Sequence, residues 1–540
     1  MKSWIRGKKA LGLLAVSLAL LIAAGCQALN GVDFNAMLKQ SLGTSSFEGS
    51  TTIEIKLLPN DEDVSDEASS AETEEMLDLL SDVKLQLDEV KSSEAKGMSA
   101  KGSLSLGELH IPFEVKTNNE TAELVLAGAR QPIRIQLTDE SAAAAGQPEN
   151  ETLAQAQKQV IDAFSGYAVD NMPNPVHLSV LPGQESVNGS TLTGMNVHAE
   201  LKGTEILDWF KSYLTALIAD KDGLEAMLTG LLEAVQSQSA LLEESPADSL
   251  FGSLPEEDKS AAAIDDAVDQ MIDALTEAQA NIAKSEQEDP EGRDRLFNDG
   301  VYVKGDLFLD GKLDIRKAVI EAGVTINDEV PAAIEENEDA DSDEDFGYED
   351  SYMTVSPFKG LWMKITTERW NVNGDVQPEA PSAGTPALDA EKLGAMEGYE
   401  VLRQFDSGSD IYHLLREQAH ISKQTVMLNT EYGPYQPIVT PGGIALVPLR
   451  YAAEAVGAQV LEERGGGIRV LDGATNTDMR LKKGGVNAII NGKTVAWRFP
   501  LTVVNDMTYV PARDFANAIG AQVSWEQDYD SKTLILVREP

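Results

Sequence analysis

Residue types that often carry chemistry are scarce in this chain of 540 residues, which contains a single cysteine and five histidines. A cysteine nucleophile needs a base placed beside it, and no such partner is evident for Cys26. The sequence also contains no Ser-His-Asp arrangement, no phosphate-binding loop and no HExxH zinc motif. We therefore expect a protein that is not an enzyme.

Two of the histidines are spaced as metal ligands on a helix would be. His413 and His420 are seven residues apart, so that they would share one face of a helix. A third ligand near them is not visible, although a metal site needs three or four side chains. We therefore expect no metal and no cofactor.

An acidic stretch at residues 335–350 contains ten carboxylates. Asp339, Asp341 and Asp343 alternate as the oxygen ligands of a calcium loop do. Glu344 stands where an EF-hand loop needs glycine for its sharp turn. We therefore expect a disordered acidic loop, and calcium binding by this loop stays open.

The charge of the chain is strongly negative, with 43 basic and 89 acidic residues and a net charge of −46. This balance argues against nucleic acid as a partner, because phosphate binding needs a surface of lysine and arginine. It favours an acidic, solvated exterior that keeps the protein soluble. The length predicts two or three domains.

The N-terminus has the composition of a targeting segment. Four basic side chains in the first nine residues precede an apolar run at residues 10–25, and the run ends at Cys26. Ala23, Ala24 and Gly25 stand directly before the cysteine. A positive segment, an apolar segment and small residues in this order are typical of a signal peptide.

These residues resemble a bacterial lipoprotein signal, with Ala23 as a departure from the leucine that is more common there. The resemblance implies a signal peptide at residues 1–25, a diacylglyceryl group on the Cys26 sulfur, and a membrane partner on the extracytoplasmic face of the cell membrane. The acyl chains would hold the protein at the bilayer by burying methylene groups. A plain secretory signal and an uncleaved anchor helix are the alternatives.

Residues 26–372 are predicted to form a large α+β domain with a curved antiparallel sheet and helices on one side. Residues 51–58 and 83–90 alternate apolar and polar side chains, as half-buried strands do. Residues 206–235 and 264–284 place apolar side chains at helical spacing. Strand patterns return from residue 301. In outline only, the order resembles half-barrel lipid-binding carriers, which implies an apolar ligand in a closed cavity.

Residues 373–422 are predicted to be a linker followed by a helical connector, because a Pro-, Gly- and Ser-rich stretch precedes helical patterns. Residues 423–540 contain one phrase twice: VPLRYAAEAVGAQV at 447–460, the first copy, and VPARDFANAIGAQV at 510–523, the second copy. In each copy a proline opens a helix and a glycine ends it with a left-handed cap. Asn491-Gly492 predicts a tight hairpin turn.

The two copies, with INGKTV upstream of the second, resemble the copper amine oxidase N-terminal-like domain, also called a stalk domain. The resemblance covers about residues 423–538 and implies a duplicated small α+β module that is not catalytic and is common on secreted proteins of Gram-positive bacteria. The catalytic domain of those oxidases needs an Asn-Tyr pair for its quinone and three copper histidines. No Asn-Tyr pair occurs in this chain, so an amine oxidase is the least favoured alternative.

The paired arginines Arg450 and Arg513 are the candidate contact residues of the repeat. They would bind an acidic polymer, or each would satisfy a local carbonyl or carboxylate. The sequence thus favours a non-enzymatic surface lipoprotein that associates with a cell-wall polymer or envelope protein through its stalk-type domain. A lipid or apolar-ligand carrier built on the large domain is the alternative.

Replacement of Cys26 by alanine tests the predicted anchor. Without the thiol that takes the diacylglyceryl group, the protein is expected in the medium or as an uncleaved precursor. Fractionation and the mass of the N-terminal peptide measure this. A Cys26→Ala protein that remains processed and bound to the membrane would contradict the prediction.

Overall fold

The computed structural model describes residues 33–59, 79–137, 159–160, 163–238, 261–325, 358–528 and 531–540. The chain divides into two compact units. Unit 1 contains the described residues up to Pro386 except 127–131, and unit 2 contains Ala127–Gln131 and Ala387–Pro540. The sequence-based boundaries were placed after residues 372 and 422.

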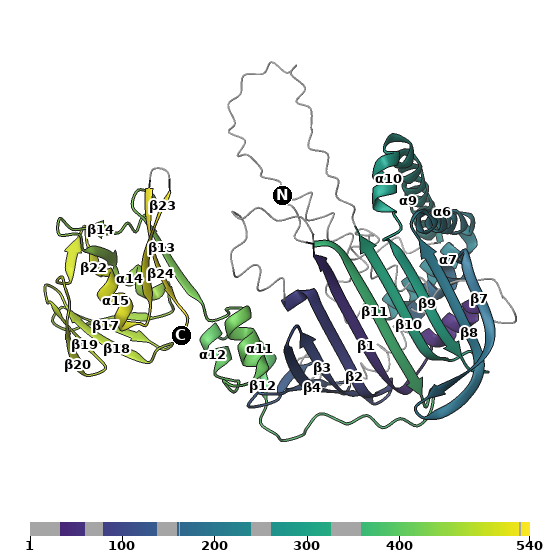
Figure 1. Cartoon of the computed structure of the whole chain (residues 1–540), viewed down its shortest axis with the longest axis horizontal. Coiled ribbons are helices and arrows are strands. Elements are labelled where there is room, and N and C mark those ends of the chain that lie inside the picture. The colour runs from purple at the N-terminus through teal and green to yellow at the C-terminus, as the bar shows by residue number, and fades with distance from the viewer. Residues whose placement is uncertain are drawn as a thin grey trace, which may run out of the picture. The chain divides into compact units, whose positions relative to one another are not determined.

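Unit 1 is built on one antiparallel sheet with the order β6-β5-β4-β3-β2-β1-β11-β10-β9-β8-β7 (Figure 1). Two meanders therefore meet where β1 pairs with β11. The strands are β1 (Ser46–Pro59), β2 (Asp82–Ser93), β3 (Gly97–Leu106), β4 (Leu109–Thr117), β5 (Thr121–Leu126), β6 (Ile133–Gln136), β7 (His177–Val187), β8 (Ser190–Lys202), β9 (Tyr302–Leu309), β10 (Ile315–Thr325) and β11 (Phe358–Trp370). The α+β prediction is confirmed.

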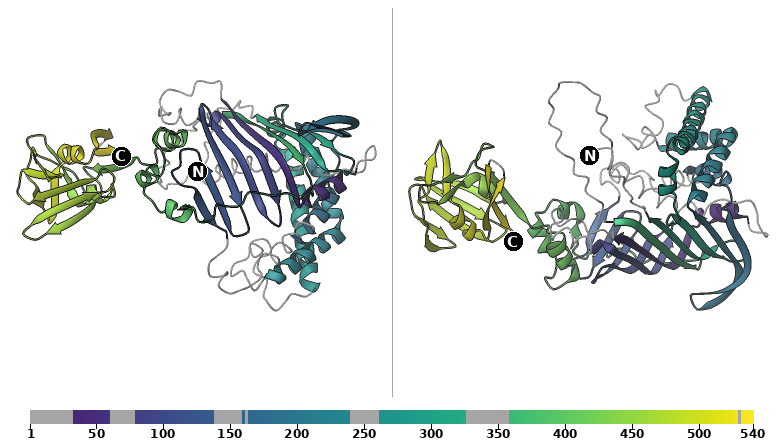
Figure 2. Two further views of the ribbon diagram at one scale, coloured as in Figure 1. Left: turned by 90° about the horizontal axis from the view of Figure 1, so that it is seen from below. Right: turned by 45° about the horizontal axis from the view of Figure 1, so that its top comes forward.

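Helices pack on the β7–β10 part of this sheet, on one side of it (Figure 2). They are α2 (Phe34–Leu42), α6 (Thr204–Ala219), α7 (Lys221–Gln238) and α9 (Ala261–Glu288), and the short helix α10 (Pro290–Leu296) contacts α9. Their apolar stripes form two buried clusters with the sheet, one around Trp209 and Leu224 and one around Met37. Among the described helices, none is both long and apolar enough to cross a membrane.

The hairpin β7–β8 was not among the predicted elements. Asn188 and Gly189, both with positive φ, form its turn. An Asn-Gly pair between alternating segments is a strong hairpin signal. Asp310 and Gly311 lie in the turn between β9 and β10, and this turn extends to Asp314.

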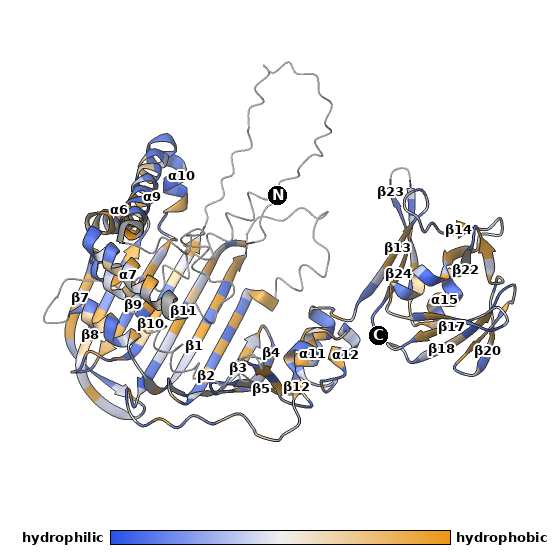
Figure 3. Cartoon of the chain, turned by 180° about the vertical axis from the view of Figure 1, so that it is seen from behind, coloured by the Kyte–Doolittle hydropathy of each residue, from blue (hydrophilic) through white to orange (hydrophobic). Residues whose placement is uncertain are grey.

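The sheet face under the helices continues as an apolar surface across β11 and β1–β6. Cross-strand partners share a face, and Ile53 is paired with Ile365 on β11 and with Leu85 on β2. The row goes on from Leu85 to Leu104 and Ile111. Most of these side chains are half-buried, and bands of hydrophobic residues cross the strands in Figure 3.

The opposite face is polar and carries residues 373–386, the first part of the predicted linker. This segment runs back along the sheet from the end of β11 (Figure 1), with Val376 buried. Buried Glu123 accepts hydrogen bonds from Arg134 at 2.7 Å and from the Ser382 backbone N–H at 3.1 Å. Burial by itself raises the pKa of Glu123, but these bonds outweigh it and leave the pKa below its ordinary value. Residues 373–386 are thus fixed to unit 1 by specific contacts.

Unit 2 contains short helices followed by the duplicated domain. Its elements are β12 (Leu388–Asp389), α11 (Ala390–Gly394), α12 (Gly398–Leu402), α13 (Asp410–His413), the π-helix η1 (Leu414–Gln418), β13 (Gln424–Asn429), β14 (Ile438–Val439), β15 (Ala445–Pro448), α14 (Leu449–Glu454), β16 (Gln459–Glu463), β17 (Gly467–Asp472), β18 (Thr477–Lys482), β19 (Asn487–Ile490), β20 (Lys493–Ala496), β21 (Thr502–Val504), β22 (Met507–Pro511), α15 (Ala512–Ala518), β23 (Gln522–Asp528) and β24 (Ser531–Arg538).

The two copies of the phrase pair with each other. Strands β15 and β22 are antiparallel neighbours in which Val447 lies opposite Val510. Their helices, α14 and α15, contribute to one common core that includes the fully buried Phe515. The copies therefore form a single domain with one hydrophobic core.

Local signals of the repeat are confirmed. Gly457 and Gly520 have φ values of 74° and 71°, and each helix ends in the left-handed cap that glycine adopts at low cost. Pro448 and Pro511 stand at the N-cap positions, one residue before the first helical residue. Asn491-Gly492 forms the turn between β19 and β20.

A buried ion pair joins the two copies. Arg538 and Asp472 are each 1% exposed in their side chains. Besides Asp472, the Arg538 guanidinium donates to the carbonyl oxygens of Val456 at 2.6 Å and Ile519 at 3.1 Å. Its Nε donates to the Gln424 side chain at 2.6 Å. All five N–H donors of the arginine thus have acceptors.

Burial by itself raises the pKa of Asp472, but hydrogen bonds from Arg538, Thr475 and the Ala474 backbone outweigh it, so that the pKa lies below its ordinary value of 3.8. A group whose folded pKa is lowered stabilises the fold above its unfolded pKa. This stabilisation is lost as the pH falls through the folded value.

We expect Asp472→Asn to lower the free energy of unfolding of unit 2 by about 3–5 kcal/mol at neutral pH, because Arg538 is left buried without a counter-charge. The difference in free energy of unfolding between this variant and the wild type becomes smaller as the pH falls below 3.8. Urea unfolding of the full chain, followed by hydrogen exchange of unit 2 peptides, measures both effects. Arg450→Ala, which removes an exposed ion pair, is the control and is expected to change stability by about 0.5 kcal/mol or less. A stability difference between Asp472→Asn and the wild type that stays constant as the pH falls through the acid range would contradict this prediction.

Candidate functional site

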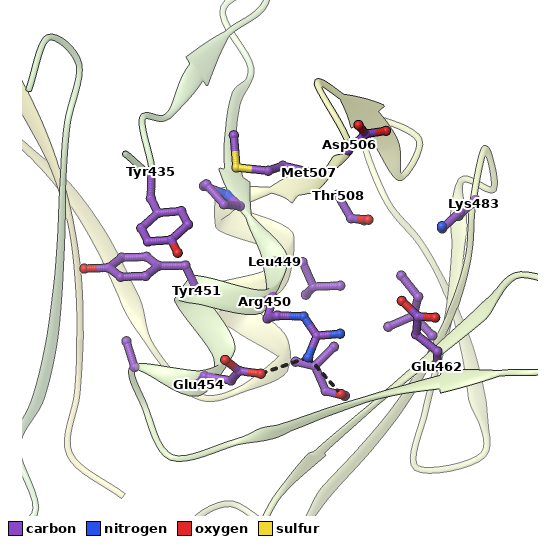
Figure 4. A pocket seen from close by; sticks show the side chains of 14 residues that line it. Tyr435, Leu449, Arg450, Tyr451, Glu454, Glu462, Lys483, Asp506, Met507 and Thr508 are labelled. Atoms are coloured by element: carbon purple, nitrogen blue, oxygen red, sulfur yellow. Dashed lines mark hydrogen bonds and ion pairs between the residues drawn. The ribbon is translucent and has the colours of Figure 1, made fainter. Parts of the chain in front are cut away.

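A pocket of about 330 Å³ opens beside the first copy of the repeat (Figure 4). Its fourteen lining residues come from Pro448 and helix α14 up to its C-cap Ala455, from the loop before β14, from strands β16 and β17, from the turn after β18, and from the turn before β22 with the start of that strand. A volume of this size lies at the lower end of the range for small-molecule sites.

Two stacked tyrosines form one wall of the pocket. The rings of Tyr435 and Tyr451 lie 4.5 Å apart at an interplanar angle of 19°, and Tyr435 is 43% exposed. The loop that carries Tyr435 is anchored next to it, because buried Tyr509 donates its hydroxyl hydrogen to the Gln436 carbonyl at 3.3 Å. The aromatic surface is therefore held in place before any ligand arrives.

Arg450 lies at the second position of α14, in the floor of the pocket. Its Nη1 donates to the Glu454 carboxylate at 3.0 Å and to the Val460 carbonyl at 3.3 Å. Glu454 follows four residues later, so the pair is of the helical i,i+4 type. The arginine side chain nevertheless stays 56% exposed.

The rim of the pocket adds further charges. Glu462 projects from β16, and Lys483 lies in the turn after β18. Asp506 lies in the turn between β21 and β22, where Asn505 and Asp506 both have positive φ. Two cations and three carboxylates thus line the pocket together with the aromatic pair.

The lining residues are suited to binding. Tyrosines, charged side chains and the hydroxyl of Thr508 provide stacking surfaces and hydrogen bonds. Among the fourteen lining residues there is no cysteine, histidine or serine to act as nucleophile or base in acyl transfer. The arrangement can hold a polar ligand in a defined orientation.

The two arginines predicted from the repeat have different surroundings. Arg450 makes the local contacts described above, whereas Arg513 is exposed. Within the described part of the chain, no hydrogen bond or ion pair involves Arg513. Its neighbour Asp514 pairs with Arg498 at 3.0 Å. Arg450 lines this pocket and Arg513 does not.

The histidine prediction is wrong in its geometry. His413 and His420 do not share a helix face, because η1 ends at Gln418 and His420 has a φ of 47°. His413 is paired with Glu417 and His420 with Glu539, both at 3.0 Å. Within the described residues, no group of three or more His, Cys, Asp or Glu side chains is placed to hold a metal ion.

Several predicted sites lie outside the described residues. These are the lipidation site Cys26 with residues 1–25, and the acidic loop with Asp339, Asp341, Asp343 and Glu344.

Comparison with known families supports the assignment of the duplicated domain. Residues 426–534 match the family model of the copper amine oxidase N-terminal domain. This domain is non-catalytic and of the stalk type. The match includes both copies of the phrase and most of the pocket-forming elements, and unit 1 lies outside it. Comparisons with curated proteins and with solved structures gave no match.

Sequence reasoning missed the tyrosines and carboxylates of the pocket. The signal lies at equivalent positions where the copies differ, since Tyr451 corresponds to Asp514 and Glu454 to Asn517. The copper amine oxidase N-terminal domain of this chain thus has the same turn, cap and core residues in both copies, and the pocket lies beside the first copy.

Proposed function

We propose that this chain is a non-enzymatic lipoprotein of the extracytoplasmic membrane face, which associates with an envelope polymer through its copper amine oxidase N-terminal domain. The observation that carries the binding role is the pocket with Tyr435, Tyr451 and Arg450 in a domain type that is non-catalytic. Polymers offer repeated small units, and a pocket of this size accepts one such unit at a time.

The membrane location is supported by the N-terminal sequence. Basic residues, an apolar run and small side chains before Cys26 follow the order of a lipoprotein signal. The acidic exterior of the chain agrees with a role in which it does not adhere to anionic lipid. The anchor would keep the binding domain beside the envelope.

An apolar-ligand carrier is the second candidate function. The continuous apolar face of β11 and β1–β6 favours it, because the helices of the described chain pack on β7–β10. Large apolar patches on soluble proteins commonly mark binding surfaces. The half-buried Leu85 and Leu104 would contact the ligand.

Binding of the soluble full-length chain, without its lipid, to purified Gram-positive cell walls tests the first proposal. Tyr451→Ala and Tyr435→Ala are each expected to weaken sedimentation with the walls about tenfold, because each removes an aromatic contact from the pocket. Tyr432→Ala is the matched control, since Tyr432 lies on the same loop, is 68% exposed and does not line the pocket. Equal wall binding by all three variants and the wild type would exclude this pocket as the binding site.

Mass spectrometry of non-covalently bound lipid in the purified protein tests the second candidate function, that of an apolar-ligand carrier. Wild type is expected to carry lipid, and Leu85→Asp to lose it because a carboxylate enters the apolar face. Gln86→Asp, on the opposite face of the same strand, is the control. A wild-type protein free of lipid would reject the carrier function.

A further inference from the structure

The free edge of Arg450 defines the kind of ligand that the pocket selects. Only Nη1 of this guanidinium is engaged, by Glu454 and Val460. Within the described residues, Nε and Nη2 make no hydrogen bond, although the side chain is fixed in place by its other contacts. A guanidinium edge with two parallel N–H groups matches a carboxylate or a phosphate.

Lys483 adds a second cation at the rim. It is exposed, and no described residue forms an ion pair with it. The lining also has three carboxylates, of which Glu454 is already paired with Arg450. An anionic group on the ligand would therefore bind at two places, the exposed Lys483 ammonium and the free edge of Arg450, and an entirely neutral ligand would leave both without an anionic partner.

The tyrosine pair selects for a flat, weakly polar surface. Tyr435 and Tyr451 cover one face of each other, and Tyr435 keeps 43% of its surface exposed. Aromatic faces carry partial negative charge and attract C–H groups with partial positive charge. A sugar ring presents such C–H groups along one face.

The carboxylates of the rim argue against a ligand that is only anionic. Glu462 and Asp506 would repel a densely charged chain such as polyphosphate or nucleic acid. Both accept hydrogen bonds, and hydroxyl groups are suitable donors. The ligand should therefore combine hydroxyl groups with an isolated negative charge.

We infer that the pocket binds an acidic sugar unit, with the ring on the Tyr435–Tyr451 pair and its carboxylate or phosphate on the free edge of Arg450. This inference rests on the proposed polymer binding and names the chemistry that the polymer carries. The two sources of the charge are a uronic acid glycan and a sugar-bearing polyol phosphate.

Calorimetric titration of the soluble full-length chain with three probes tests the inference: an oligogalacturonate, a galactose-substituted glycerol phosphate oligomer, and a neutral galactan oligomer of equal length. At least one acidic probe is expected to bind about tenfold or more tightly than the neutral one, and added salt weakens that preference. The stronger acidic probe identifies the source of the charge.

Arg450→Gln is expected to weaken binding of the preferred acidic probe about 10- to 100-fold, because a charge-assisted pair of hydrogen bonds is lost. Arg450→Lys, which keeps the positive charge but lacks the two parallel N–H donors of the guanidinium, should recover only part of this loss. Arg513→Gln, at the equivalent exposed position of the second copy, is the control and should bind as wild type does.

Two results would overturn the inference. One is equal affinity for neutral and acidic oligomers, and the other is an Arg450→Gln variant that binds the acidic probe as wild type does. If walls still bind through Tyr451 in either case, the proposed function stands and only the ligand class is wrong. If walls do not bind at all, the proposed function itself fails.

Discussion

Unit 2 depends on the hydrogen bonds of one buried cation. Arg538 binds the Val456 and Ile519 carbonyls, which occupy the same position in the two copies, at the C-terminal ends of α14 and α15. Helix ends leave unpaired carbonyls with partial negative charge, and a cation there satisfies both needs. Asp472 supplies the counter-charge that makes burial of the arginine tolerable. The duplication is thus joined around one side chain that belongs to neither copy.

In this domain the residues that form the fold are distinct from the residues that line the pocket. Prolines, glycines and core residues recur in both copies because strand-to-helix joints require them. Exposed helical positions carry no such requirement, so Tyr451 and Glu454 differ from Asp514 and Asn517. Tyr451 and Glu454 of the first copy line a pocket, whereas Asp514 of the second copy forms an ion pair with Arg498. A duplicated module can hold its fold constant while one copy acquires a binding surface.

Features set by neighbouring residues were predictable, and features set by distant residues were not. The left-handed caps at Gly457 and Gly520 and the turn at Asn491-Gly492 follow from local backbone preferences. The Tyr435–Tyr451 stack and the Arg538 contacts join residues that are remote in sequence, so no local pattern announces them. The Asn188-Gly189 turn of the β7–β8 hairpin is also a local signal, but Pro182 and Gly183 interrupt the alternation of β7 and weaken its strand pattern.

The pairing of β1 with β11 determines how late in synthesis the sheet of unit 1 can be completed. Glu48 and Trp370 lie side by side in the centre of the sheet although 322 positions separate them. Most strand pairs within each meander are neighbours in sequence, although residues 203–301 separate β8 from β9. The seam between β1 and β11 closes only after nearly the whole of unit 1 has been synthesised. Closure of so long a loop is slow relative to hairpin formation. The sheet of unit 1 therefore stays divided into two parts until β11 has been synthesised, and only the pairing of β1 with β11 makes it continuous.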